Sequence, residues 1–491
     1  MTTPSPRELC RFARELACAA ADVPRLRTLA TLVAALALVL GSALVPAAAF
    51  PAPTIVPPVI DPGLLPPPNL PPRPSEETEQ KSVCQRPVLT GAPPRTVPLA
   101  QRQLDLAAAW QFSRGYGQTV AVIDTGVNPH PRLPILIAGG DYVSGSDGLA
   151  DCDGHGTLVA GLIAARPSPG DGFSGVAPEA AVLGIRQLSL AFEAKDFNRR
   201  QQQGDLAGSG YGHVLTLALA VVHAVEMGAT VINISEVACA AAGEPVDDGA
   251  LGAAVKFAND RNVVVVAAAG NLQQNGPCKA QNDGVGWSAA KTVASPAWFS
   301  QYVLSVGSVD ADGAGSPFSI HGPWVSVAAP GRGIISLDSG PGAIGLVNAT
   351  PGEKGELHPI DGTSFSSAYV SGVAALVRSR FPALTARQVM DRIIRTAHAP
   401  GAGRDDTIGA GMIDPVAALT AQLPMQPVEV GATLPKPVAA PPPLAREDPW
   451  PKQISAVGTL ACLGVLGVGY AMSIPYRRDS RRRKLSENVD Y

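Results

Sequence analysis

The sequence of 491 residues has no excess of positive charge. Its 38 lysines and arginines stand against 41 aspartates and glutamates, which gives a formal net charge of −3. Proteins that bind nucleic acid need a basic surface that attracts the phosphate backbone, and here the arginines gather only near the two chain ends. The charge balance therefore excludes nucleic acid as a partner.

Charged residues are scarce altogether, at 16% of the chain, whereas 47 prolines and 51 glycines exceed ordinary usage. Proline concentrates at residues 51–74 and 424–451. Such segments favour extended polyproline geometry over a packed core. We expect the first to be an arm along the surface or a linker, the alternative being a ligand for a proline-binding module. We expect the second to be a tether.

Charge is absent from one long stretch near each end of the chain. Five arginines precede the apolar residues 29–45, which predicts a secretory signal in residues 1–50 or, alternatively, an uncleaved anchor.

Residues 454–474 carry no charge, and a helix that rises about 1.5 Å per residue would cover about 30 Å of hydrocarbon there. The alternative for this stretch is a buried core helix. Six basic residues follow it and predict a cytoplasmic tail at 475–491, with residues from about 50 to 452 outside the cytoplasm.

No two cysteines have the C-x-x-C spacing of a zinc or redox site. Four of the seven lie in the part expected outside the cytoplasm, where an even number favours disulfides: Cys84, Cys152, Cys239 and Cys278. Four cysteines allow three pairings. We favour the pairing of nearest neighbours, Cys84 with Cys152 and Cys239 with Cys278.

No cofactor is required by any motif in the sequence. Asp310 and Asp312, with Gly313, resemble the start of a calcium loop but lack its later glutamate, which favours a simple turn. Structural calcium therefore cannot be assigned to particular residues. Residues 192–212 are polar and are expected to form an exposed insertion that could overhang a cleft.

Short apolar runs rich in β-branched residues alternate with helical patterns in the middle of the chain. Strands are predicted at 120–123, 182–185, 231–234, 263–268 and 303–306, and helices at 155–165, 213–227, 250–261, 364–380 and 385–398. Strands buried on both faces and separated by helices form a parallel sheet covered by helices. The sequence therefore predicts an α/β fold of three layers with a central, mostly parallel sheet.

Three motifs supply the residues of a nucleophilic mechanism. Asp124 ends the first strand in VAVIDTGV, His155 begins a helix in DGHGT, and Ser364 begins another in DGTSFSSAYVSG. A serine hydroxyl needs an imidazole to remove its proton, and the imidazole needs a buried carboxylate to orient it. Each motif alone could be a turn or a helix cap. Together they predict an Asp–His–Ser catalytic triad.

The order Asp, His, Ser and the segment VVVVAAAGN at 263–271 make the chain resemble the subtilases over about residues 116–423. The resemblance implies that Asn271 donates its amide to the oxyanion, with the backbone amide of Ser364 as second donor. A plain turn is the alternative for Asn271. Ala368 stands where the family commonly has proline. Glu236 follows Ser235 at a position where the family has a glycine-rich segment that lines the substrate. The substrate specificity of the family is therefore in doubt for this chain.

The whole architecture resembles the mycosins, the subtilases of type VII secretion in mycobacteria and other actinobacteria. It would consist of a signal (1–50), a proline-rich extension (51–115), a catalytic domain (116–423), a linker (424–453), a transmembrane helix (454–474) and a tail (475–491). The resemblance implies that the extension wraps the catalytic domain, that Cys84 joins it to Cys152, and that the second disulfide ties down a surface loop.

The resulting expectation is a single-pass, extracytoplasmic serine endopeptidase that processes secreted proteins and supports a secretion complex in the membrane. Two alternatives stay open. The first is a general cell-surface protease that belongs to no complex. The second is a structural secretion subunit whose triad is covered by the extension or by residues 192–212.

Overall fold

The computed structural model describes residues 55–196, 210–274, 276–352, 354–423 and 457–472. The chain divides into two compact units, Met1–Ala421 and Gln422–Tyr491. In the second unit the described residues 457–472 form a helix. Among the described residues, no helix is both long enough and apolar enough to cross a membrane. The predicted signal at 1–50, the 424–453 linker and the tail at 475–491 lie outside the described residues.

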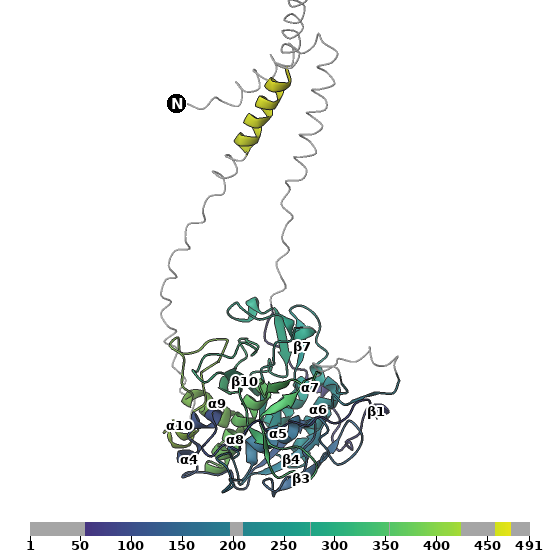
Figure 1. The fold of residues 1–491 in the computed structure, drawn as a ribbon, viewed down its shortest axis with the longest axis vertical. Helices are drawn as coiled ribbons and strands as arrows, with labels where there is room; N and C mark the ends of the chain where they lie inside the picture. Colours follow the sequence, from purple (N-terminus) through teal and green to yellow (C-terminus); the bar gives the residue numbers. More distant parts are fainter. Residues whose placement is uncertain (1–54, 197–209, 275, 353, 424–456, 473–491) are drawn as a thin grey trace, which may run out of the picture. The chain divides into compact units, whose positions relative to one another are not determined.

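A seven-stranded sheet forms the centre of the first unit (Figure 1). Its strands follow the order β11-β10-β8-β6-β2-β4-β3, and every neighbouring pair is parallel. The strands are β2 (Thr119–Asp124), β3 (Leu136–Asp141), β4 (Ala181–Arg186), β6 (Val231–Ile234), β8 (Val264–Ala268), β10 (Val303–Val309) and β11 (Val327–Pro330). The predicted α/β class with a central parallel sheet is confirmed.

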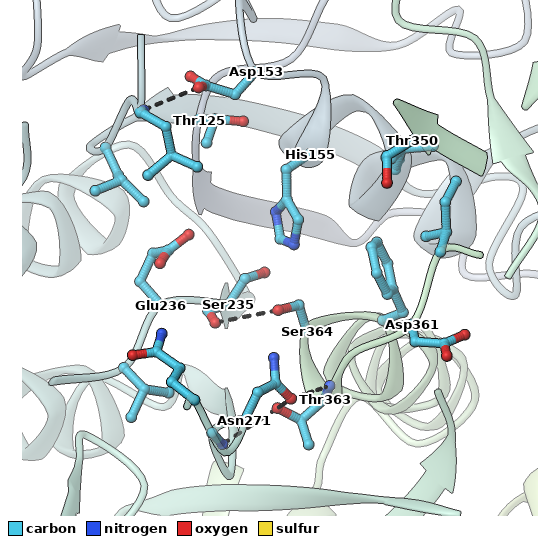
Figure 2. A pocket seen from close by; sticks show the side chains of 18 of the residues that line it. Thr125, Asp153, His155, Ser235, Glu236, Asn271, Thr350, Asp361, Thr363 and Ser364 are labelled. Atoms are coloured by element: carbon cyan, nitrogen blue, oxygen red, sulfur yellow. Dashed lines mark hydrogen bonds between the residues drawn. The ribbon is translucent and has the colours of Figure 1, made fainter. Parts of the chain in front are cut away.

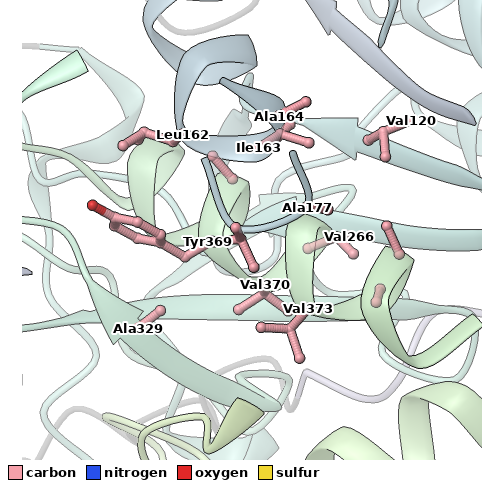
Figure 3. Close-up of a cluster of buried hydrophobic side chains, with 14 of the residues drawn as sticks. Val120, Leu162, Ile163, Ala164, Ala177, Val266, Ala329, Tyr369, Val370 and Val373 are labelled. Atoms are coloured by element: carbon pink, nitrogen blue, oxygen red, sulfur yellow. The ribbon is translucent and has the colours of Figure 1, made fainter. Parts of the chain in front are cut away.

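Helices cover both faces of this sheet because alternate strand residues point to opposite sides and both sets are apolar. Val120 and Val122 of β2 pack into one core layer, whereas Ala121 and Ile123 pack into the other. The first layer contains α5 (His155–Ala164), α8 (Thr363–Arg380), α9 (Ala386–Thr396) and α10 (Pro415–Thr420), and the second contains α6 (Val214–Glu226) and α7 (Gly249–Asp260). Figure 3 shows the first layer, with Val370 and Val373 of α8 packed among residues of α5 and the sheet.

Short elements surround the three layers. They are η1 (Pro62–Leu64), α3 (Leu99–Arg102), α4 (Leu106–Ala109), η3 (Pro277–Lys279) and η4 (Trp287–Ala289), together with four antiparallel pairs: β1 (Thr78–Gln80) with β5 (Phe192–Ala194), β7 (Ala238–Ala241) with β9 (Thr292–Ser295), β12 (Ser336–Leu337) with β13 (Leu346–Val347), and β14 (Ala349–Pro351) with β15 (Leu357–Pro359).

The described part of the proline-rich extension lies along the surface of this unit. The backbone amide of Asn69 donates to Glu226 at the end of α6 at 2.8 Å, and that of Ser75 donates to the hydroxyl of Tyr211 at 3.1 Å. Strand β1 then pairs with β5. Farther on, the amide of Thr90 donates to the Asn348 side chain at 2.7 Å. Residues far apart in the catalytic unit are therefore joined by one extended segment.

The described residues form two disulfides, and these follow the nearest-neighbour pairing. Cys84 of the extension is bonded to Cys152, and Cys239 of β7 is bonded to Cys278 of η3. The first bond lies three residues before His155, so the extension is covalently attached beside the start of α5. The second joins strand β7 to the loop that follows β8.

Removing the bond between Cys84 and Cys152 should lower the free energy of unfolding. A link across 68 residues restricts the unfolded chain, and its loss costs about 4 kcal/mol in the loop-entropy model. The measurement is urea unfolding of the purified Cys84→Ser/Cys152→Ser protein. Cys462→Ser is the matched control, because Cys462 is the free cysteine of the described residues and its loss breaks no link. Equal unfolding midpoints for the double variant and the control would contradict a stabilising role for the bond.

Candidate active site

One strand end and two helix starts bring the predicted triad residues to the same edge of the sheet. Asp124 is the last residue of β2, His155 is the first of α5, and Ser364 is the second of α8. Ligand sites in parallel sheets lie beyond the carboxyl ends of the strands. Here a cleft of about 360 Å³ opens at that position, and both His155 and Ser364 line it (Figure 2).

Asp124 and His155 form a short, buried pair. The distance between Asp124 Oδ1 and His155 Nδ1 is 2.7 Å, and the aspartate is wholly buried. The backbone amide of Thr125 also donates to Oδ1, at 2.8 Å. A carboxylate bound at Nδ1 selects the tautomer with its proton there, which leaves Nε2 free to accept a proton. The imidazole also packs against the ring of Phe365, with 5.2 Å between centroids.

This pairing sets the ionisation of both groups. Burial disfavours the charged form of each side chain, but the attraction between the two charges and their hydrogen bond outweigh it. The pKa of Asp124 is therefore lowered, and the pKa of His155 is raised to about 9. Asp124 is thus held as the anion that orients the ring.

Ser364 points into the cleft below the imidazole of His155 (Figure 2). Its Oγ donates a long hydrogen bond of 3.5 Å to the carbonyl of Ser235. None of the hydrogen bonds between described residues joins Ser364 to His155. Catalytic hydrogen bonds of this kind are often long without substrate and tighten when substrate binds.

Asn271 lies across the cleft with its amide oriented by Thr363. Its Oδ1 accepts hydrogen bonds from the backbone amide of Thr363 at 3.0 Å and from the hydroxyl of Thr363 at 2.9 Å. The NH₂ group of Asn271 is therefore the end that remains for a ligand. The backbone amide of Ser364 lies in the first turn of α8, where a helix leaves its amides unpaired. These two donors fit an oxyanion hole.

Two glycines allow α5 to begin close to the end of β2. Gly126 has φ of +104°, a left-handed conformation that favours glycine. A Cβ on Gly156 would collide with the carbonyl oxygen of Gly126 and would contact the Asp124 side chain at 3.1 Å. The glycines in the two motifs therefore permit the short distance between Asp124 and His155.

Asp151 is a residue of the site that the sequence reasoning missed. Its buried carboxylate accepts hydrogen bonds from Thr125 Oγ1 at 2.9 Å, from the Gly154 amide at 2.7 Å, and from the Thr157 amide and hydroxyl at 2.8 and 2.6 Å. Burial raises the pKa of Asp151 to about 6, although the bonds from Thr157 oppose this rise. Asp151 joins the loop after Asp124 to the turn before His155. An aspartate just before a helix start was the available signal.

Glu236 also lies beside Asp124 and His155. One of its carboxylate oxygens, one of Asp124 and a ring nitrogen of His155 all lie within 4.8 Å of one another. Burial, followed by the negative charge of Asp124, raises the pKa of Glu236 to about 8. Carboxylate and imidazole groups at this spacing could hold a divalent cation. The close pairing of Asp124 with His155 already uses two of the three groups, however.

The other candidates of the sequence analysis lie away from this chemistry. Asp310 pairs with Arg332 at 2.8 Å and accepts from Ser316 at 2.6 Å, and Asp312 accepts from the Ala314 amide within a turn. Of the expected insertion 192–212, residues 197–209 lie outside the described residues. Leu188 and Leu190, just before it, line the cleft. Helix α8 continues without interruption through Ala368.

Comparison with known proteins identifies the family of the chain. The model of the subtilase family matches residues 115–411. Mycosin-3 of Mycobacterium tuberculosis is 44% identical over 420 residues, covering 82% of this chain and 89% of that protein. Mycosin-1 of Mycolicibacterium smegmatis is 45% identical over 410 residues, covering 81% and 89%.

Solved structures show the same relationship. The structure of the MycP3 protease from the type VII (ESX-3) secretion system superimposes with a TM-score of 0.69 at 49% identity, covering 75% of this chain and all of that one. A chain of the intact ESX-5 inner membrane complex superimposes with a TM-score of 0.70 at 45% identity, covering 85% of this chain and all of that one. The chain therefore belongs to the subtilase family of serine proteases and, within it, is homologous to the mycosins.

Proposed function

We propose that the protein is a serine endopeptidase of the cell envelope in which Asp124, His155 and Ser364 form the catalytic triad. The observation that carries this proposal is the 2.7 Å contact of the buried Asp124 with His155, in a cleft that Ser364 also lines. Its substrates are secreted proteins, and it acts as part of a type VII secretion complex. The similar chain in the ESX-5 inner membrane complex supports that setting.

The reaction proceeds through an acyl-enzyme. His155 Nε2 removes the proton of Ser364 as Oγ attacks the peptide carbonyl carbon, and Asp124 stabilises the imidazolium that forms. The NH₂ group of Asn271 and the backbone amide of Ser364 stabilise the oxyanion. His155 then gives the proton to the leaving amine, the C–N bond breaks, and water releases the acyl group by the same steps in reverse.

Export and anchoring complete the proposal. Residues 1–50 act as the signal, 51–115 as the extension and 116–423 as the catalytic domain, while 424–453 link this domain to a membrane segment at 454–474 and a basic cytoplasmic tail at 475–491. The support is the uncharged stretch followed by six basic residues, together with the related chain in an inner membrane complex.

Membrane anchoring predicts that alkaline carbonate will not extract the protein from membranes. A spanning segment is held by apolar contacts, which high pH does not weaken, whereas a peripheral protein is released. The measurement is the fraction of protein in the membrane pellet, with a variant ending before residue 454 as the control. Release of the full-length chain into the soluble fraction would refute the anchor.

Ser364→Ala should reduce peptide cleavage by about 10⁴-fold or more, because it removes the nucleophile. Ser379→Ala, near the other end of the same helix, is the matched control and should cleave normally, because it removes only a hydrogen bond to the carbonyl of Tyr116. Secretion should be measured in the same strains. Lost cleavage with retained secretion indicates a separate structural role in the complex, whereas unchanged cleavage contradicts the triad.

The rate of cleavage should rise with pH until His155 loses its proton. Only the neutral imidazole can accept the proton of Ser364, and the pKa of His155 is raised to about 9, so kcat/KM should increase as the pH approaches 9. In Asp124→Asn the attraction that raises this pKa is lost, so the rise should move to lower pH while the maximal rate falls by about 10⁴-fold. A pH profile of kcat/KM for both proteins provides the measurement. An unmoved profile would contradict the pairing.

A further inference from the structure

Glu236 is a carboxylate without a hydrogen bond among the described residues, in a cleft whose described lining contains no lysine or arginine. It is half-buried, and none of the hydrogen bonds or ion pairs within the described part of the chain involves it. It follows Ser235, whose carbonyl accepts the hydrogen bond of the nucleophile Ser364. Any peptide bound for attack by Ser364 must therefore pass close to Glu236.

The other two carboxylates that line the cleft already have partners. Asp153 accepts from the Ser189 hydroxyl at 2.6 Å and from the Leu190 amide at 2.9 Å. Asp361 accepts from the Gly333 amide at 2.7 Å and lies 3.5 Å from the guanidinium of Arg332. No lysine or arginine is among the described residues that line the cleft. Glu236 is thus the carboxylate of the cleft that is left for a ligand.

We propose that Glu236 determines substrate specificity by pairing with a lysine or arginine side chain of the bound peptide. This inference rests on the proposed protease function and adds the class of substrate. A partly desolvated carboxylate without a hydrogen bond is costly, and a cation supplied by the substrate removes that cost on binding. The basic residue lies near the scissile bond, because the Glu236 carboxylate is within 4.8 Å of the His155 ring.

The pKa of Glu236 also agrees with a cationic ligand. Burial and the charges of Asp124 and Asp153 raise the pKa of Glu236 to about 8, while His155 opposes this rise. A lysine or arginine beside it would favour the charged carboxylate. Preference for a basic residue should therefore become stronger as the pH increases through about 8, when Glu236 is ionised before the peptide binds.

The test compares pairs of fluorogenic peptides that differ at one position, with lysine in one and norleucine in the other. Norleucine keeps the length of the side chain and lacks its charge. Scanning the position along the peptide should find one place where lysine raises kcat/KM about tenfold or more. This preference should disappear in Glu236→Gln and should turn into a preference for glutamate in Glu236→Lys.

Glu356→Gln is the matched control. Glu356 is exposed at the turn of the β14–β15 hairpin, pairs with His358 at 3.4 Å and does not line the cleft, so above pH 8 its loss changes the net charge equally. The control should keep the lysine preference in full. All assays contain EDTA, so that no divalent cation bound by Asp124, His155 and Glu236 competes with the peptide.

Binding of the same peptides to Ser364→Ala separates the two proposals. The lysine peptide should bind about tenfold more tightly than the norleucine peptide, and Ser364→Ala/Glu236→Gln should bind both equally. If the wild-type protein cleaves no peptide but this binding difference is present, the protease proposal fails and the role of Glu236 stands. Equal binding of both peptides to Ser364→Ala at every position, or a lysine preference that survives in Glu236→Gln, overturns the role of Glu236.

Discussion

The contact between Asp124 and His155 requires an ionised carboxylate that is buried away from solvent. A buried charge is unfavourable unless an opposite charge and hydrogen bonds compensate it. Asp124 has both, since His155 lies at 2.7 Å and the amide of Thr125 donates to the same oxygen. Much of the nearby structure maintains this contact. Glycine at 126 and 156 lets the two backbones approach, and Asp151 bonds to the segments that carry both members of the pair.

The N-terminal extension is also attached close to the contact between Asp124 and His155. Its disulfide joins Cys84 to Cys152, which lies between Asp151 and His155 in the sequence. The extension also pairs with β5 and bonds to Asn348. It is therefore part of the framework that holds the turn before α5. It lies beside the cleft but does not fill it, so His155 and Ser364 both line the open cleft.

The sequence predicted those parts of the structure that depend on local chemistry. Five strands and five helices were predicted correctly because the spacing of their apolar residues is regular. The three motifs of the proposed triad stood out because nucleophilic catalysis tolerates few residue types. Strand β3 was missed because its residues 136–141 include two adjacent glycines, and β11 because it is short and ends in Pro330. The bond of Asp151 with Thr125 and the position of Glu236 beside Asp124 and His155 join residues that are distant in the sequence. No periodic pattern records such contacts, so only the folded structure reveals them.

Helix α8 carries Ser364, the proposed nucleophile, and also fills the middle of one core layer. It lies near the carboxyl end of the catalytic unit, long after Asp124 and His155 in the order of synthesis. A nascent or truncated chain that stops before α8 lacks both the attacking hydroxyl and the apolar surface that closes the core. Completion of the core and the proposed catalytic activity therefore depend on the same helix, and a chain that stops before α8 has neither.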